Sequence, residues 1–412
     1  MAKIKPFKSI RPKKGLEKRI AALPYDVYSR QEAAEKVKGD DLTFLRIDRP
    51  ETQFPPGEDM YAPKVYEKAR ELLWQMTKDG SYIQDPGEYY YLYELTMDSR
   101  SQTGLVACAS VDDYENQVIK KHENTRTEKE QDRIRHVDTC GAQTGPIFLA
   151  YRSDEAIEEL VRNRKKEAPE YDFVSEDGIR HRVWVIKDAE EIKQITNRFA
   201  KIENLYIADG HHRAASAVKV GLKRRAEKPD FDGSEEFNYF LSVLFPDSEL
   251  MIMDYNRVVH DLNGNTEEEF LEKLGRICEV KAVDDAYHPK KKGEVGLYLN
   301  HRWYQLTFKE EFQSEDPVDG LDVSILQKEI LQSILGIEDP KTSDRIEFIG
   351  GIRGLEELER RVNEGCAAAF AMYPTNISEL FAVADANRLM PPKSTWFEPK
   401  LRSGIFIHKI DE

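Results

Sequence analysis

A polar cluster at residues 209–213, Asp-Gly-His-His-Arg, constrains the fold of this chain more than any other stretch. The apolar, β-prone residues 205–208 before it predict a strand that ends at the cluster. The alanine-rich segment after it predicts the first turns of a helix. The sequence therefore predicts a strand, a glycine turn and a helix N-terminus, with two histidines and an arginine at the junction.

A junction of this kind can bind anions. The first N–H groups of a helix have no carbonyl partner within the helix, and the helix dipole favours negative charge there. Arg213 adds a guanidinium that can bind two oxygens of a phosphate or carboxylate, beside His211 and His212. The alternative is a plain strand-to-helix junction in which Asp209 caps the helix and the histidines are solvated.

A second polar cluster, Lys-Lys-His-Glu-Asn-Thr-Arg, occupies residues 120–126 and precedes a predicted helix over residues 127–137. His122, Glu123, Thr125 and Arg126 stand before this helix rather than on it. An imidazole, a carboxylate, a hydroxyl and a guanidinium at a helix entrance can bind a metal, a phosphate or a small polar substrate. The alternative is a solvated charged surface, which is the common reading of a charge run.

Composition excludes several classes of protein. The chain has 412 residues, of which 40% are hydrophobic and 33% charged, which is typical of a soluble protein with two or three domains or with one large elaborated domain. A formal net charge of −15 argues against binding to nucleic acid or to an anionic membrane. No apolar run reaches the roughly 20 residues of a membrane helix, and the N-terminus lacks a signal-peptide core. The four cysteines lie far apart in the sequence, which indicates reduced thiols rather than a disulfide framework or a paired zinc motif. We expect a cytoplasmic protein, for which a second copy of the chain is a candidate partner.

The remaining pattern predicts a mixed α/β fold of the α+β class. Alternation predicts a strand over residues 42–47, a helix over 62–78 and hairpin strands over 89–97 and 104–111. The pattern changes near residue 263, after which strands and helices alternate. We therefore expect a catalytic core over residues 1–262 and an additional C-terminal α/β region over residues 263–412, which can close over the site.

Two loops carry further candidate residues. Tyr25 and Asp26 lie in a compact proline turn that is either structural or part of a substrate-binding loop. Lys393, Ser394 and Thr395 lie in a proline-constrained segment that either closes over a phosphate or forms a surface connection tied down by the aromatic residues 396–397.

The two clusters together resemble those of a bacterial and archaeal family, domain of unknown function 1015. The resemblance covers nearly the whole chain and includes the turn 24–27, the Asp-Arg pair 132–133 and the tail 392–400. The family label itself states no activity.

A more distant resemblance concerns the cluster at 209–213, which is similar to the phosphate-binding motif of the ParB/sulfiredoxin-like fold. Free-serine kinases of that fold carry an Asp-Gly-His-His-Arg run and an upstream catalytic glutamate. The resemblance implies that Glu123 is this glutamate, that Asp209 holds Mg²⁺ or orients the motif, and that the nucleotide phosphates are held by Gly210, His211, His212 and Arg213. This chain departs from those kinases in size and spacing. The positions of Glu123 and Asp209 differ by 86 (209 − 123), so a substantial insertion separates the two motifs.

The same residues suit phosphoryl transfer chemically. That reaction needs electrostatic binding of the moving group, a metal, and a base for the hydroxyl proton. Glu123 can be the base if the motifs meet, and Arg126 or Lys121 can hold a substrate carboxylate. We place His122 and His211 with the catalytic candidates and Thr125 with the nucleotide-binding ones. The leading hypothesis is a kinase that uses Mg²⁺ and ATP or ADP to phosphorylate a small hydroxyl compound, with free L-serine and O-phosphoserine as the leading pair.

Two other hypotheses stay open. A metal-dependent hydrolase or phosphatase would use Asp209, His122, His211 and His212 as ligands, although neighbouring histidines rarely point at one ion. A non-catalytic nucleotide-sensing protein would use the same phosphate-binding element as a switch. A hydrolase should need metal but no nucleotide, a sensor should tolerate loss of Glu123, and a kinase requires both nucleotide and Glu123.

Overall fold

The computed structural model describes residues 1–411 and divides the chain into two compact units. Unit 1 comprises Met1–Leu250 and the C-terminal segment that begins at Pro399, and unit 2 comprises Met251–Glu398. This division differs from the single boundary expected at residue 262. β14 (Tyr255–Val259) bonds to unit 2 strands on both sides, and β21 (His408–Lys409) pairs with β7 (Ala142–Gln143) of unit 1. Pairing between strands therefore decides where each segment belongs.

The main sheet of unit 1 contains nine of the strands described in residues 1–411. Its order is β6-β11-β8-β12-β5-β4-β10-β9, and β1 pairs with β5. Pairing is parallel between β6 and β11 and between β8 and β12, and antiparallel elsewhere. The strands are β1 (Ile4–Lys5), β4 (Tyr90–Met97), β5 (Arg100–Ser110), β6 (Ile119–Lys120), β8 (Ile147–Tyr151), β9 (Tyr171–Val174), β10 (Arg180–Ile186), β11 (Leu205–Asp209) and β12 (Tyr239–Pro246). A separate small ladder joins β2 (Ile10–Pro12) and β3 (Tyr82–Gln84).

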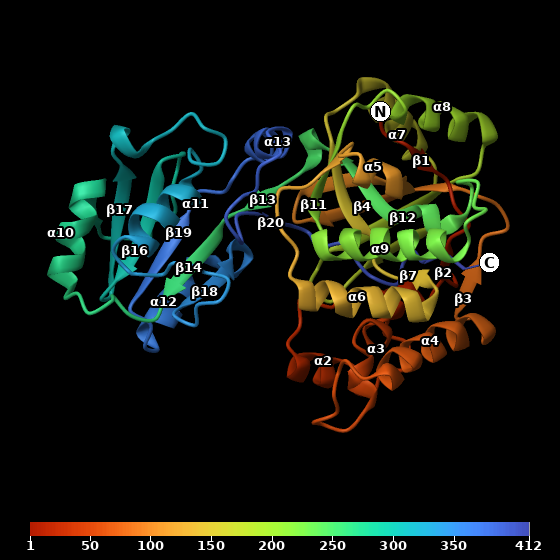
Figure 1. The fold of residues 1–412 in the computed structure, drawn as a ribbon, viewed down its shortest axis with the longest axis horizontal. Helices are drawn as coiled ribbons and strands as arrows, with labels where there is room; N and C mark the ends of the chain where they lie inside the picture. Colours follow the sequence, from red (N-terminus) through yellow and green to blue (C-terminus); the bar gives the residue numbers. More distant parts are fainter. Residues whose placement is uncertain (412) are drawn as a thin grey trace. The chain divides into compact units, whose positions relative to one another are not determined.

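Two long helices, α6 (Thr127–Cys140) and α9 (His211–Glu227), run side by side along this sheet (Figure 1). Apolar residues of α9, such as Ala214 and Val218, pack on the sheet core, because they recur at helical spacing on one side. The other helical segments of unit 1 are α1 (Glu17–Ile20), α2 (Arg30–Lys36), α3 (Leu45–Asp48), η1 (Pro50–Gln53), α4 (Pro63–Lys78), α5 (Val111–Glu115), α7 (Glu155–Arg164), α8 (Ala189–Phe199), η2 (Glu236–Asn238) and η3 (Asp247–Glu249).

The helix expected over 62–78 and the hairpin strands expected over 89–97 and 104–111 are confirmed by α4, β4 and β5. The strand expected over 42–47 is wrong, because this segment turns into the short helix α3. Phe44, Leu45 and Ile47 are all buried in a second apolar core with α4. A run this short fits both the strand and the helix period, so packing decided its conformation.

Unit 2 contains a six-stranded sheet in the order β15-β17-β16-β19-β14-β18, antiparallel throughout, beside a small ladder of β13 and β20. Its strands are β13 (Ile252–Met253), β14 (Tyr255–Val259), β15 (Cys278–Val283), β16 (Glu294–Leu299), β17 (Arg302–Phe308), β18 (Ile346–Gly350), β19 (Ala368–Met372) and β20 (Trp396–Phe397). Its helical segments are α10 (Glu267–Ile277), η4 (Glu310–Phe312), α11 (Asp322–Ile325), the π-helical η5 (Leu326–Gln332), η6 (Gly351–Arg353), α12 (Gly354–Asn363) and α13 (Ile377–Asp385). The mixed α+β class expected from the sequence is confirmed. Within residues 1–411, no helix is long and apolar enough to cross a bilayer.

Candidate functional site

The predicted strand, glycine turn and helix form the structural centre of the candidate site. β11 ends at Asp209, Gly210 adopts φ +93° and ψ 33°, and α9 begins at His211. A β-carbon on Gly210 would lie 3.0 Å from Arg213 Nε, so the arginine packs directly over the turn. Only glycine adopts this backbone conformation without strain and also leaves room for the guanidinium.

The helix has Gly210, not Asp209, at its N-cap position, and no side chain accepts a capping hydrogen bond there. The Asp209 carboxylate instead accepts the Gly210 N–H through Oδ1 at 2.8 Å. Because no side chain caps the helix, the first turn of α9 keeps the N–H groups that make a helix start attractive to anions.

The two sequence motifs meet at one edge of the sheet. β6 and β11 are parallel neighbours, so the segments that follow them leave the sheet on the same side. The His122 ring packs edge-on against the His211 ring, with centroids 4.5 Å apart and planes at 88°. Both side chains are buried, at 2% and 7% exposure. The insertion between the motifs therefore does not keep them apart.

Both histidines are neutral at neutral pH. Burial lowers the pKa of His122 to about 4, against the opposing effects of a backbone hydrogen bond to Ile207 and the charge of Asp209. Burial, and then the neighbouring His122, lower the pKa of His211 well below its usual value. His122 Nδ1 and His211 Nε2 have no hydrogen-bond partner among residues 1–411. The pair thus offers neutral imidazole nitrogens to a ligand, not positive charge.

Positive charge comes from two other side chains. Lys400 Nζ lies 3.3 Å from Asp209 Oδ2, and Arg213 Nη2 lies 3.9 Å from the same oxygen. Burial would raise the pKa of Asp209, but these two cations outweigh it and hold the pKa well below its usual range. Lys400 is not among the site residues predicted from the sequence, although it belongs to the tail segment 392–400 that carries part of the family resemblance.

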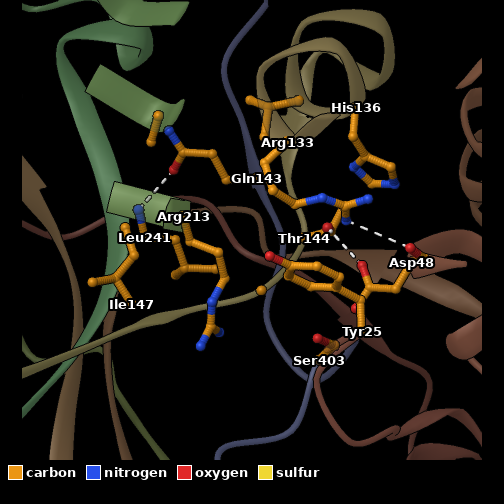
Figure 2. Close-up of a pocket in the computed structure, with 13 residues that line it drawn as sticks. Tyr25, Asp48, Arg133, His136, Gln143, Thr144, Ile147, Arg213, Leu241 and Ser403 are labelled. Atoms are coloured by element: carbon orange, nitrogen blue, oxygen red, sulfur yellow. Dashed lines mark hydrogen bonds between the residues drawn. The ribbon is translucent and has the colours of Figure 1, made fainter. Parts of the chain in front are cut away.

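Arg213 also lines a small cavity of about 30 Å³, together with Tyr25, Arg133, Thr144 and Ser403 (Figure 2). Its Nη1 donates to the Pro146 carbonyl at 2.7 Å. The Arg133 guanidinium lies 4.0 Å from the centre of the Tyr25 ring. Tyr25 and Arg213 were predicted from the sequence as site residues. Arg133 was not, although the Asp-Arg pair 132–133 is part of the family resemblance.

An adjoining cavity of about 160 Å³ shares Tyr25 and Arg133 and is also lined by Asp26, Tyr61 and Tyr66. Asp26 is exposed at this cavity. The turn selected from the sequence therefore borders both cavities.

Thr125 lies in a network between α6 and α9. Its hydroxyl donates to Glu130 Oε2 at 2.6 Å, and Lys219 forms an ion pair with the other oxygen of Glu130. This bond uses the hydroxyl proton of Thr125, so Thr125 can donate to a phosphate only by exchanging it. The buried carboxylate of Glu130 was not selected from the sequence.

Glu123 is half-buried next to His122, whereas Lys121 and Arg126 are exposed. Lys121 Nζ lies 5.3 Å from the centre of the Tyr114 ring. The Lys121 and Arg126 side chains therefore lie on the surface beside the sheet edge where the two motifs meet. Their roles toward a substrate stay predictions.

Lys393, Ser394 and Thr395 belong to unit 2, and local hydrogen bonds hold their loop. Ser394 Oγ donates to the Pro391 carbonyl at 2.6 Å, and Arg257 Nη2 donates to the Lys393 carbonyl at 3.1 Å. The Trp396 ring packs edge-on against Tyr255, with centroids 5.0 Å apart. The loop is therefore held in place by hydrogen bonds and aromatic packing. A phosphate-binding role for Lys393, Ser394 and Thr395 stays a prediction.

Within residues 1–411, one group of three side chains is placed to hold a metal ion, and it lies in unit 2. The ligands of the hydrolase hypothesis, His122, Asp209, His211 and His212, do not form such a group. Among these four residues, the Asp209 carboxylate is the ligand that suits Mg²⁺. The ion would then be bound by this one carboxylate and otherwise by phosphate oxygens and water, which is a common arrangement for Mg²⁺.

These features define a mixed α/β protein with an anion-attracting helix start at the edge of its main sheet. The sequence model of the family described as "Protein of unknown function (DUF1015)" matches residues 4–324, and the chain belongs to this family. The family resemblance seen in the sequence is confirmed over residues 4–324, a range that does not include the tail 392–400. No curated protein matches the chain.

Several solved structures are similar to it, and three of them illustrate the range. A variant of a free serine kinase in complex with AMP is 15% identical, with 71% of this chain and 87% of that chain covered and a TM-score of 0.37. A conserved hypothetical protein from Pyrococcus furiosus is 16% identical, with coverages of 74% and 94% and a TM-score of 0.34. C-terminally truncated SbnI from Staphylococcus aureus is 10% identical, with coverages of 71% and 82% and a TM-score of 0.36. At these identities and TM-scores, the similarity carries no argument about the function of this chain.

Proposed function

We propose that the protein is a kinase that transfers a phosphoryl group from ATP or ADP to the hydroxyl of a small molecule, with free L-serine as the leading acceptor. The contact of His122 with His211, at 4.5 Å between ring centroids, is the observation that carries this proposal. It brings the Glu123 motif and the phosphate-binding motif to one edge of the sheet. A base and a phosphate site must share one place for phosphoryl transfer.

The first turn of α9 binds the phosphates in this proposal. The backbone N–H groups of residues 211–213 face the ligand, whereas the Gly210 N–H is bonded to Asp209, and Arg213 and Lys400 supply charge beside them. Asp209, kept ionised by these two cations, is the residue that would hold Mg²⁺ together with phosphate oxygens. When bound, Mg²⁺ neutralises charge on the transferred group.

Glu123 is the base. The hydroxyl oxygen of the acceptor forms a bond to the terminal phosphorus of the nucleotide, and the bond from that phosphorus to the leaving phosphate oxygen breaks. The hydroxyl proton passes to the Glu123 carboxylate. The neutral rings of His122 and His211 can orient the reacting groups through hydrogen bonds without adding charge.

The cavity sizes favour a small acceptor. The cavity beside Arg213 measures about 30 Å³, enough for about two water molecules, so it fits a carboxylate or phosphoryl group rather than a nucleoside. The neighbouring cavity of about 160 Å³, with the rings of Tyr61 and Tyr66, offers more room for a nucleoside. Lys121 and Arg126 are candidates for the carboxylate of an amino acid.

The test incubates the purified protein with Mg²⁺, L-serine and either ATP or ADP, and measures O-phosphoserine by mass spectrometry. Glu123→Ala and His212→Ala are assayed in parallel, with Glu159→Ala as the control because Glu159 is an exposed glutamate on α7. We expect product from the wild type and from Glu159→Ala, and at least a 100-fold loss in Glu123→Ala.

Nucleotide binding without any phosphorylated product from a panel of small hydroxyl compounds would contradict the kinase and favour a sensor. Product formation that persists in Glu123→Ala would reject Glu123 as the base. Absence of nucleotide binding would reject the phosphate-binding role of residues 209–213.

A further inference from the structure

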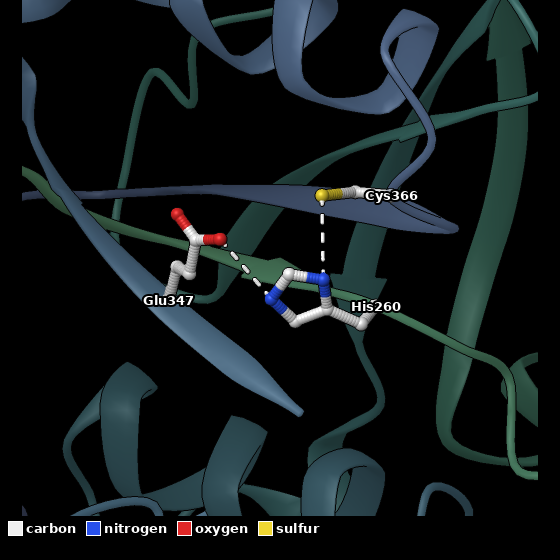
Figure 3. Close-up of side chains that lie close together, drawn as sticks. All are labelled: His260, Glu347 and Cys366. Atoms are coloured by element: carbon white, nitrogen blue, oxygen red, sulfur yellow. Dashed lines mark hydrogen bonds and ion pairs between the residues drawn. The ribbon is translucent and has the colours of Figure 1, made fainter. Parts of the chain in front are cut away.

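We propose that unit 2 contains a zinc site formed by His260, Glu347 and Cys366 (Figure 3). The proposed kinase function uses none of these residues. One nitrogen, one carboxylate oxygen and one sulfur from these side chains lie within 4.8 Å of one another. No short sequence motif predicts this group, because the three residues come from separate segments of the chain.

Three neighbouring strands bring the residues together. β14 lies between β18 and β19 in the sheet. His260 directly follows β14, and its N–H donates to the Arg345 carbonyl at 3.0 Å. Glu347 lies in β18, and Cys366 lies two positions before the start of β19. The pairing of these strands therefore brings the three backbones together, and the Cys366 N–H donates to the Arg361 carbonyl at 3.1 Å.

The distances approach those of a tetrahedral zinc ion. Cys366 Sγ lies 3.7 Å from His260 Nδ1, and Glu347 Oε1 lies 3.1 Å from His260 Nε2. Zinc bonds of about 2.0 Å to nitrogen or oxygen and about 2.3 Å to sulfur separate neighbouring ligand atoms by about 3.3–3.6 Å. The two ring nitrogens face different partners, so one ion requires rotation of the His260 ring. The His260 side chain is 39% exposed, which leaves room for this rotation.

A neighbouring arginine orients the carboxylate ligand. Arg361 Nη1 donates to Glu347 Oε2 at 2.7 Å, which orients the carboxylate and leaves Oε1 toward the histidine. Such outer contacts commonly orient metal ligands. A set of one sulfur, one imidazole nitrogen and one carboxylate oxygen suits zinc better than Mg²⁺ or Ca²⁺, which prefer oxygen ligands. Three protein ligands leave a fourth position for water.

The test uses the full-length, untagged protein after removal of metal with a chelator. Zn²⁺ is titrated by calorimetry, and Co²⁺ is titrated as a spectroscopic substitute whose thiolate bond gives a near-ultraviolet charge-transfer band. Cys366→Ala and His260→Ala are compared with Cys278→Ala and His288→Ala, which remove a thiol and an imidazole elsewhere in unit 2. All variants are first checked for wild-type thermal unfolding in the absence of metal.

We expect one Zn²⁺ per chain, proton release on binding and a cobalt–thiolate band in the wild type. Cys366→Ala should abolish the band, His260→Ala should weaken binding at least 100-fold, and both controls should bind as the wild type does. Absence of binding at micromolar Zn²⁺, or binding that survives Cys366→Ala, would overturn the proposal. Alkylation of Cys366 that depends on His260 while no metal binds would also overturn it and indicate a reactive thiol instead.

Discussion

The side-chain amine of Lys400 lies 3.3 Å from Asp209 Oδ2, although the two residues are 191 positions apart in the sequence. The segment that begins at Pro399 returns to unit 1 and places this cation at the end of β11. Arg213 lies 3.9 Å from the same carboxylate oxygen. Asp209 is thus held as an anion between two cations at the start of α9.

We predict that Lys400→Met raises the pKa of Asp209 and weakens nucleotide binding about tenfold, or about 1.4 kcal/mol, because one cation beside the phosphates is lost. The depressed pKa of Asp209 contributes stability above the pKa of an unfolded aspartate, and this contribution is lost as pH falls. Without Lys400 the pKa of Asp209 is less depressed, so this contribution is smaller. The variant should therefore unfold at a higher pH than the wild type during acid titration. Calorimetric binding of ATP and ADP and acid unfolding measure the two effects. Lys8→Met, which removes an exposed lysine, is the control, and equal effects of the two variants would refute the role of Lys400.

We predict that Gly210→Ala disrupts the site beyond its effect on stability. The positive φ costs about 1–2 kcal/mol for any residue with a side chain, and the new methyl group would also displace Arg213. Gly15→Ala is a matched control, because Gly15 has a similar φ of +94° and open space around its β-carbon. Thermal unfolding should show similar losses in both variants, while nucleotide binding should fall only in Gly210→Ala. Normal binding in Gly210→Ala would argue against a close phosphate contact at this turn.

We predict that Arg213→Lys lowers kcat by about 10²–10³ if the protein is a kinase, because an ammonium cannot reproduce the forked contact of a guanidinium. The lysine would also lose the geometry that joins the Pro146 carbonyl and Asp209. Arg224→Lys on the same helix, where Arg224 forms an ion pair with Asp138, should keep wild-type kinetics. Steady-state kinetics of both variants test this prediction. An unchanged kcat in Arg213→Lys would show that Arg213 does not stabilise the transition state.

We predict that the protein loses stability as pH falls from about 6.5 to about 4. In this window an unfolded His122 takes up a proton, whereas the buried His122, with a pKa of about 4, does not. Falling pH therefore favours unfolding. His122→Gln should reduce the slope by at most about 1.4 kcal/mol per pH unit, the value for one proton. Thermal unfolding across the window tests this prediction, with His301→Asn at an exposed turn as the control. A slope in His122→Gln equal to that of the wild type would show that His122 is not a source of the pH dependence.

Local sequence patterns predicted the centre of the site well. The apolar run before Asp209, the glycine and the alanine-rich segment each have a strong local preference, and together they form β11, the turn and α9 as expected. The segment 42–47 shows the limit of such patterns. Its alternation fitted a strand, yet burial of Phe44, Leu45 and Ile47 against α4 favours the helix α3.

The sequence by itself determined the strand, the glycine turn and the helix at 205–227, the polar motif at 120–126 and membership of the family, because these depend on residues that are close together in the chain. Only the tertiary structure decided which distant residues meet. The parallel pairing of β6 with β11 brings His122 to His211, and the returning C-terminal segment brings Lys400 to Asp209. The alignment of β14, β18 and β19 likewise gathers His260, Glu347 and Cys366. Such contacts follow from strand order and register, which are set by cooperative packing of the whole sheet and leave no local pattern in the sequence.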